Sequence, residues 1–113
     1  MREFTGGGLT ISDVSDASAQ NEAIALVLGR SGVLRLFILP AHWKSQLKGP
    51  REDWSVEDLP RVSMGDLAKE AVVGRLIMEQ REAVVTISRG VPLAIIVPGN
   101  PYWRRVVREK GGE

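Results

Sequence analysis

Residues 62–103 read VSMGDLAKEAVVGRLIMEQREAVVTISRGVPLAIIVPGNPYW, and this stretch decides the fold. It opens on a helix start, because Ser63 and Asp66 have the spacing of a capping box. The hydroxyl can accept a hydrogen bond from an orphan helix amide, and the carboxylate lies at the positive end of the helix. Apolar residues then recur at helical spacing. Gly74 predicts a break or kink, since glycine costs about 1 kcal/mol relative to alanine in a helix interior.

A β-hairpin is predicted after this bent helix. Residues 83–88 and 91–97 are apolar, β-branched runs on either side of Arg89-Gly90. Gly90 supplies the positive φ that a tight hairpin turn requires. The second run is apolar on both faces, so helices of this chain or a second subunit must cover both sides of it.

A C-terminal helix should begin at Asn100-Pro101, with Asn100 as the N-cap and Pro101 in the first helical position. This helix is amphipathic. One side carries Tyr102, Trp103, Val106 and Val107, and the other carries Arg104, Arg105 and Arg108. Residues 109–113 are expected to fray. The sequence thus predicts one unit over residues 62–108.

The N-terminal part is predicted to hold a smaller β-α-β-α unit over residues 9–47. Residues 1–8 end in three glycines and are expected to be a flexible N-terminus. A short strand at 9–12 should lead into a helix running to about Leu28. The candidate N-caps of this helix are Ser12, Ser15 and Asp16.

Residues 33–39 form an apolar run of strand length and predict a buried strand, followed after Pro40 by a short helix. Residues 48–61 mix two prolines, a glycine and many charges, which is typical of a linker. Trp54 lies within this linker and is expected to dock against the folded part, because a linker indole rarely stays in solvent.

The two halves share an order of elements. Each half has, in order, a helix, a turn, a strand that ends in proline, and a tryptophan. In the first half the turn is Arg30-Ser31-Gly32 and the tryptophan is Trp43; in the second half they are Ser88-Arg89-Gly90 and Trp103. A degenerate repeat of this kind would make the chain a pseudo-dimer whose two units share one sheet. The alternative is that short β-helix-β pieces look alike by chance.

Composition favours an ordinary α+β domain. The chain has 113 residues, of which 43% are hydrophobic and 26% charged, and a net charge of +1, so bulk charge implies no particular partner. It has no cysteine, no apolar run of membrane-spanning length and no secretion signal at its start. We therefore expect a cytoplasmic protein with no membrane contact.

The stretch 62–103 resembles the Phd/YefM family of antitoxins from type II toxin–antitoxin systems. The strand and cap VSM, and above all the hairpin AVVTISRG-VPLAIIVP followed by a Tyr-containing helix start, carry the resemblance. It implies a fold of strand, bent helix, β-hairpin and C-terminal helix. It also implies a dimer that binds operator DNA, represses its own operon and neutralises a toxin with a tail that follows the folded part.

DNA contacts in that family come from the first strand–helix junction and the hairpin turn. Carried over, the resemblance places them at Ser63, Lys69 and Arg89, and the parallel turn of the first half adds Arg30. A rigid hairpin tip can hold the Arg89 guanidinium against phosphate or a base edge at little entropic cost. Candidate partner contacts are Tyr102, Trp103, Val106 and Val107, residues that also suit a core or dimer interface.

No set of residues suits catalysis, a metal or another cofactor. His42 is the one histidine, and without cysteine or a second histidine it cannot complete a metal site. It also has no Ser or Cys partner at a plausible spacing for nucleophilic catalysis. Glu79 and Glu82, like Glu57 and Asp58, have the pattern of solvated surface charges. The sequence therefore predicts a binding protein, with no enzymatic role.

Two functions remain open. The first is an antitoxin-like DNA-binding regulator whose partners are operator DNA and a toxin, as a homodimer or an internal pseudo-dimer. The second is a protein-interaction module that keeps the Phd-like fold without DNA binding. Two departures from the family favour the second: Ala68 stands where a basic residue is common, and 61 residues precede the matching stretch.

Overall fold

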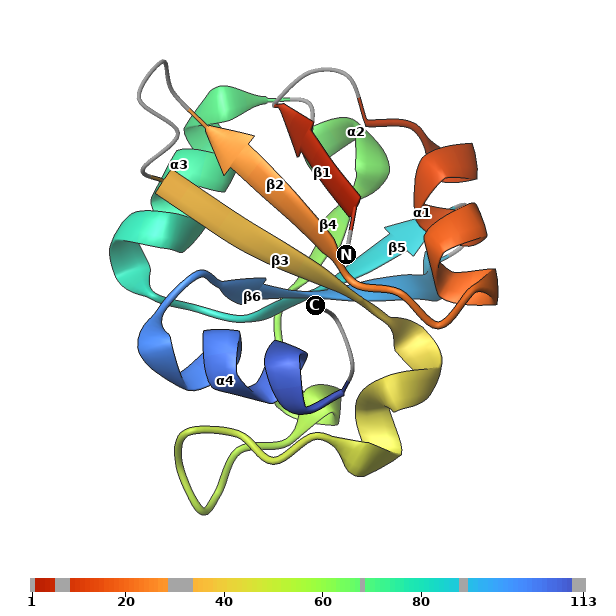
Figure 1. The fold of residues 1–113 in the computed structure, drawn as a ribbon. Helices are drawn as coiled ribbons and strands as arrows, with labels where there is room; N and C mark the ends of the chain where they lie inside the picture. Colours follow the sequence, from red (N-terminus) through yellow and green to blue (C-terminus); the bar gives the residue numbers. More distant parts are fainter. Residues whose placement is uncertain (1, 6–8, 29–33, 68, 88–89, 111–113) are drawn as a thin grey trace.

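The structure, a computed structural model, describes residues 2–5, 9–28, 34–67, 69–87 and 90–110. The first half of the chain contains β1 (Arg2–Thr5), α1 (Ile11–Ala19), β2 (Ile24–Leu28), β3 (Leu34–Pro40) and the 3-10 helix η1 (Ala41–Gln46). The second half contains β4 (Arg61–Ser63), α2 (Met64–Leu67), α3 (Glu70–Glu79), β5 (Ala83–Ile87), β6 (Val91–Pro98) and α4 (Pro101–Glu109). A 3-10 helix, η2 (Val56–Asp58), lies in the connection. The α+β class is confirmed (Figure 1).

The described strands form one six-stranded mixed sheet in the order β1-β2-β3-β6-β5-β4. In each half the outer two strands are parallel and the inner two antiparallel, and β3 and β6 join the halves as an antiparallel pair. The predicted hairpin is therefore present as β5 and β6. From either edge inward, the first, second and third strands of one half therefore correspond to the first, second and third strands of the other: β1 to β4, β2 to β5 and β3 to β6.

The central pairing has the register that a two-fold axis requires. Ile38 of β3 lies opposite Ile96 of β6, and these two residues are 58 positions apart, as are Pro40 and Pro98. Pro40 lies opposite Ala94, and Pro98 lies opposite Leu36. Exchange of the two halves with this offset maps the β3–β6 ladder onto itself, with Ile38 and Ile96 changing places. The strand order and this register are those expected of two units arranged with pseudo-two-fold symmetry.

Each face of the sheet carries its own core. One core packs α1, α2 and α3 against the sheet, with Ile38 and Ile96 at its centre. The other packs η1, α4 and Trp54 against the opposite face, with Trp43 and Trp103 among its buried residues. Figure 1 shows α2 and α3 above the sheet and α4 with residues 41–60 below it. The sheet is covered on both faces, which agrees with the two-sided apolar character of its central strands.

Two strands of the first half differ from the sequence prediction. β1 occupies part of segment 1–8, where a flexible N-terminus is expected, and the Arg2 amide donates to the carbonyl of Ala23 at 3.2 Å. β2 occupies Ile24–Leu28, where a helix is expected. The reason is that β2 lies between β1 and β3 and is buried on both faces. Its uniform apolar run lacks the alternation that identifies a half-exposed strand.

The first helix begins at a different cap from those predicted. The N–H of Asp13 donates to Oγ1 of Thr10 at 3.2 Å, and the N–H of Thr10 donates to Oδ2 of Asp13 at 2.9 Å. This capping box makes Thr10 the N-cap, so the predicted strand at 9–12 is wrong. The three residues predicted as N-caps lie inside the helix and do not cap it: Ser12, Ser15 and Asp16.

Both halves end their helix with a residue of left-handed backbone. Asn21 has φ 59°, and the N–H of Glu22 donates to the carbonyl of Ala17 at 2.8 Å. Gln80 has φ 52°, and the N–H of Arg81 donates to the carbonyl of Leu76 at 3.1 Å. These bonds have the pattern of a Schellman motif, which turns the chain back toward the sheet. In the first half this motif leads into β2, in the segment where the sequence predicts that the helix continues to about Leu28.

The helix of the second half breaks earlier than Gly74. The break lies between α2 and α3, where the N–H of Lys69 donates to the carbonyl of Asp66 at 3.0 Å in a tight i to i+3 turn. Gly74 lies inside α3, so the break predicted at this residue is wrong. No heavy atom lies within 4 Å of a Cβ built on Gly74, which means that no contact depends on its lack of a side chain.

The connection 48–61 is docked on the sheet through Trp54, as expected for a linker indole.

The predicted tail 109–113 begins at the last residue of α4, and residues 111–113 lie outside the described part. Among the helices that the structure describes, none has the length and apolar character needed to cross a bilayer.

Candidate functional site

The strand–helix junction of the second half has the predicted cap. The N–H of Asp66 donates to Oγ of Ser63 at 3.1 Å, and the N–H of Ser63 donates to Oδ2 of Asp66 at 3.3 Å. Both partners are accessible at the edge of the sheet, where β4 passes into α2. The cap therefore orients the start of α2 and leaves its polar groups open to a ligand.

Lys69 lies one turn beyond this cap and is exposed. Its Nζ is 3.6 Å from Oδ1 of Asp66. Hydrogen bonds from Ser63, and more weakly the charge of Lys69, hold the pKa of the Asp66 carboxyl below its usual value. A phosphate that approaches Lys69 must therefore compete with an ionised carboxylate.

Arg61 joins this end of the sheet to the hairpin. Its Nη1 donates to the carbonyl of Gly90 at 3.1 Å, across from β4 to the start of β6. Gly90 has φ 73°, the positive value expected for the turn. The sequence gives no signal for Arg61, which it places in the linker, because the contact depends on strand pairing. Arg89 and Arg30, the candidates in the two turns, lie outside the described residues.

Arg61, Ser63, Lys69 and Gly90 together form what we call the β4 end. Its counterpart in the first half has the opposite charge. Glu3 lies opposite Ala25 in β1, the position that Arg61 occupies opposite Val84 in β4. The helix that follows, α1, contains two aspartates and neither lysine nor arginine. The two halves therefore share the order and directions of their strands and differ in the charge at this end.

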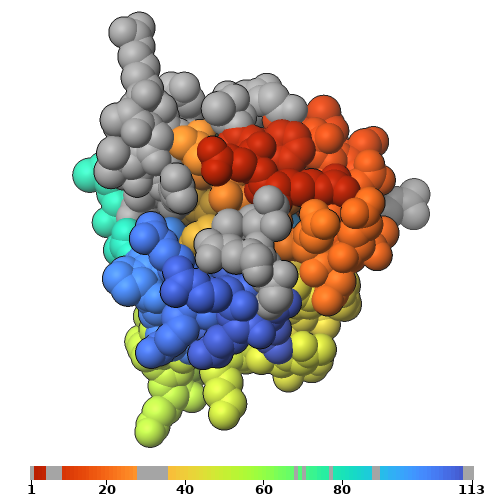
Figure 2. Space-filling view, in the orientation of Figure 1, coloured from red at the N-terminus to blue at the C-terminus, as the bar shows by residue number. Residues whose placement is uncertain are grey.

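The predicted partner residues separate into two pairs. Trp103 and Val107 are buried in the core below the sheet and offer no surface to another molecule. Tyr102 and Val106 are half-buried and line a groove of about 500 Å³ between α4 and the end of η1. Figure 2 shows α4 as a large part of the visible surface, with the segment after residue 40 below it.

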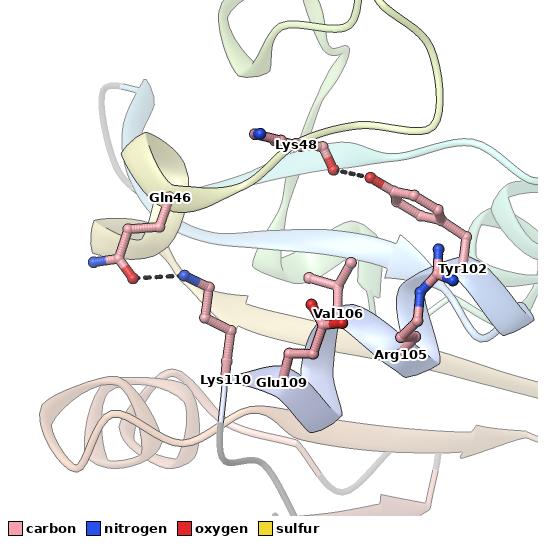
Figure 3. Close-up of a pocket in the computed structure, with 7 residues that line it drawn as sticks. All are labelled: Gln46, Lys48, Tyr102, Arg105, Val106, Glu109 and Lys110. Carbon is pink, nitrogen blue, oxygen red and sulfur yellow. Dashed lines mark hydrogen bonds between the residues drawn. The ribbon is translucent and has the colours of Figure 1, made fainter.

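Hydrogen bonds from Tyr102 in α4 and from Lys110 just after it reach the end of η1 and the chain that follows, one at each end of this α4 groove (Figure 3). The hydroxyl of Tyr102 donates to the carbonyl of Lys48 and, at 2.9 Å, to that of Gly49. Nζ of Lys110 donates to Oε1 of Gln46 at 2.7 Å. The groove is held between two elements far apart in sequence.

The α4 groove carries an excess of positive charge. Lys48, Arg105 and Lys110 line it together with one carboxylate, Glu109. The guanidinium of Arg105 lies over the ring of Tyr102 at 5.8 Å, in the geometry of a cation–π contact. The groove is suited to an acidic surface with an apolar side chain that can reach Tyr102 or Val106.

His42 has a structural partner. Its Nε2 is 2.9 Å from Oδ1 of Asn21, the residue that ends α1, and Nε1 of Trp43 donates to the same oxygen at 2.6 Å. Within the described ranges, no group of three His, Asp or Glu side chains could hold a metal ion. His42 thus fixes η1 to the turn after α1.

Glu82 differs from the solvated carboxylate that the sequence predicts, because its side chain is 3% exposed. It receives a hydrogen bond from Nε1 of Trp54 at 2.7 Å. The sequence could not reveal this pairing, since 27 residues separate the two partners.

Comparison of the whole chain with protein-family models, with curated proteins and with solved structures finds no match in any of the three.

Proposed function

We propose that this chain is a single-chain counterpart of a Phd/YefM antitoxin dimer and acts as a DNA-binding regulator that also binds a protein partner. The observation that carries the proposal is the two-fold register of Ile38 and Ile96. Each half has a strand, a capped helix, a hairpin and a helix, which is the order that the resemblance implies for one antitoxin chain. Two such units sharing one sheet would replace the two subunits of a dimer.

DNA would be contacted by the β4 end alone. Arg61 and Lys69 supply cations there, and Arg89 belongs to the adjoining turn in the sequence. The first half has Glu3 where the second has Arg61, and Asp16 three residues after its capping aspartate, where the second has Lys69; these two carboxylates repel phosphate. We therefore expect the chain to recognise one half-site, without the palindrome that a symmetric dimer selects.

A mobility shift with the DNA upstream of the protein's own coding sequence tests this function. About three phosphate-contacting cations predict a slope of about −3 for log K against log salt concentration. Lys69→Ala and Arg89→Ala should each weaken binding and make this slope shallower. Arg104→Ala is the matched control, because Arg104 is an exposed arginine on α4, which packs on the other face of the sheet. Absence of a shift at low salt would sink the DNA-binding proposal.

The second candidate function, a protein-interaction module without DNA binding, is favoured by the carboxylates of Glu3 and Asp16 in the first half and by the α4 groove. The product of a neighbouring gene, above all one for a toxin, is the natural partner to test by co-purification. Arg105→Glu should abolish a complex formed through the groove, while Arg104→Glu on the same helix should have a smaller effect. A complex that survives Arg105→Glu would place the partner elsewhere.

A further inference from the structure

A second pocket, of about 370 Å³, lies below the sheet between η1, η2 and the strands of the second half. Val84, Ala94 and Ile95 lie at its floor and are at most 5% exposed. Ala41, Val56 and Pro92 form its apolar walls and are more accessible. The pocket is therefore an apolar hollow against the sheet residues of the second half, and we call it the η1 pocket.

Comparison of the two halves accounts for this space. Ile95 occupies the position that Phe37 occupies in the other half, 58 residues earlier. The helix that covers this side is η1, of six residues, where α4 has nine. Ile95 is smaller than Phe37, and η1 is shorter than α4, so a volume that Phe37 and α4 fill in one half is left empty in the other. The η1 pocket thus lies where the two halves differ, and there the sheet of the second half is less completely covered.

The rim of the η1 pocket is polar and has one unmatched cation. Lys44 and Glu57 form an ion pair with Nζ and Oε1 3.4 Å apart, so their charges cancel. Arg61 donates to the neutral carbonyl of Gly90. Among the described residues, no carboxylate lies within ion-pair distance of Arg61. Its guanidinium has five N–H donors and is held in place at the mouth of an apolar cavity.

We infer that the η1 pocket binds a small molecule with a compact apolar body and a single carboxylate, such as an aromatic carboxylic acid. The apolar body would cover Val84 and Ile95, and the carboxylate would accept hydrogen bonds from Arg61. A planar guanidinium can bind both oxygens of a carboxylate with two parallel hydrogen bonds. One negative charge is favoured because the rim carries one uncompensated positive charge.

The walls favour a compact ligand over an extended peptide. η1, η2 and the sheet border the pocket on three sides, and its volume falls in the range of small-molecule sites, which begins at about 300 Å³. The apolar body of such a ligand gains free energy from covering the partly exposed walls at Ala41, Val56 and Pro92. This inference does not depend on DNA binding, and the assay below contains no DNA.

A matched pair of probes tests the inference: 2-naphthoate and 2-naphthylmethanol, which share a bicyclic body and differ in charge. Isothermal titration should show binding of 2-naphthoate that is about tenfold tighter than that of the alcohol, the effect expected of one charged hydrogen-bonded contact. In the wild-type protein, methyl chemical shifts of Val84 and Ile95 should move on titration, while those of Val106 in the α4 groove should stay constant.

Arg61→Gln should reduce the affinity for 2-naphthoate to that of the alcohol and leave the alcohol unaffected. Arg51→Gln is the control, because Arg51 is an exposed arginine that does not line the pocket. Equal affinity of the two probes, or shifts that map outside the η1 pocket, would overturn the inference. A third result would also overturn it: an acidic peptide that contains an aromatic residue shifts the methyl signals of Val84 and Ile95, while 2-naphthoate does not bind. That result would assign the pocket to a protein partner.

Discussion

The indole of Trp54 donates a 2.7 Å hydrogen bond to Oε1 of Glu82, a carboxylate that the surrounding chain removes almost completely from solvent. The same oxygen lies 3.9 Å from Nη2 of Arg51. The ring of Trp54 also packs 5.5 Å from the ring of Trp103. One side chain of the connection thus joins the turn after α3 to the core beneath α4.

Removal of this donor should destabilise the fold. Trp54→Phe keeps an aromatic ring but leaves the buried Glu82 carboxylate without its N–H partner, which we expect to cost about 2 kcal/mol of unfolding free energy. The double variant Trp54→Phe/Glu82→Gln should recover part of this loss, because a neutral amide is cheaper to bury than a charge. Urea unfolding of the four proteins measures the coupling. Additive effects of the two substitutions would contradict the role given to the hydrogen bond.

Two glycines should respond to alanine in opposite ways. Gly90→Ala places a Cβ on a residue with φ 73° and should destabilise the protein by about 1 kcal/mol. Gly74→Ala lies inside α3, where an added Cβ meets no atom within 4 Å, and should stabilise it by about 1 kcal/mol. Thermal unfolding of both variants checks the pair. A stabilised Gly90→Ala protein would show that the turn does not need its left-handed residue.

Acid stability should depend on Asp66. Its hydrogen bonds with Ser63 lower the pKa of the carboxyl in the folded protein. A lowered folded pKa means that ionised Asp66 stabilises the fold above the ordinary carboxyl pKa, and that this contribution is lost as the pH falls through the folded value. Asp66→Asn should therefore flatten the pH dependence of the unfolding free energy below about pH 4.

Ser63→Ala serves as the matched variant for this measurement, because it removes the hydroxyl, the second cause of the lowered pKa, and keeps both the carboxylate and the backbone N–H that lowers the pKa most. It should flatten the same part of the curve by less than Asp66→Asn does. Denaturant titrations from about pH 2 to about pH 7 cover the window. If both variants follow the wild-type curve at acid pH, the capping box has no electrostatic role in stability.

The two-fold relation within the chain predicts a monomer. β3 and β6, the strands that would form the interface of a dimer, already pair with one another at Ile38 and Ile96. Sedimentation equilibrium should give the mass of one chain, 12.4 kDa. A stable species of twice that mass would show that a further surface, such as the α4 groove, joins two copies.

Sequence reasoning succeeded where the interactions are local. The Ser63–Asp66 cap is present, and Oδ1 of Asn100 accepts a 3.0 Å hydrogen bond from the N–H of Trp103 as an N-cap should. The Gly90 turn has the expected backbone. In each case the partners lie within a few residues of one another, so composition and spacing alone indicate the geometry.

It failed where the environment of a segment comes from distant parts of the chain. Ile24–Leu28 has no alternation because strands on both sides and helices on both faces bury it, and an isolated reading cannot distinguish it from a helix. The charge and proline content of residues 48–61 predicts a linker for Arg61, although pairing with β5 makes it part of an edge strand. The sequence predicts a solvated Glu82, because Trp54, the residue that buries and hydrogen-bonds it, lies far away in the chain.

The capped helix, the glycine turn and the amphipathic C-terminal helix follow from the amino-acid sequence, because hydrogen bonds and periodicity over a few residues suffice for them. The three matching strands of the first half, the contact of Arg61 with the hairpin and the pocket beneath η1 become visible only in the folded chain. Strand pairing, burial and cavity volume depend on partners dozens of residues apart, and no local pattern encodes which partners will meet.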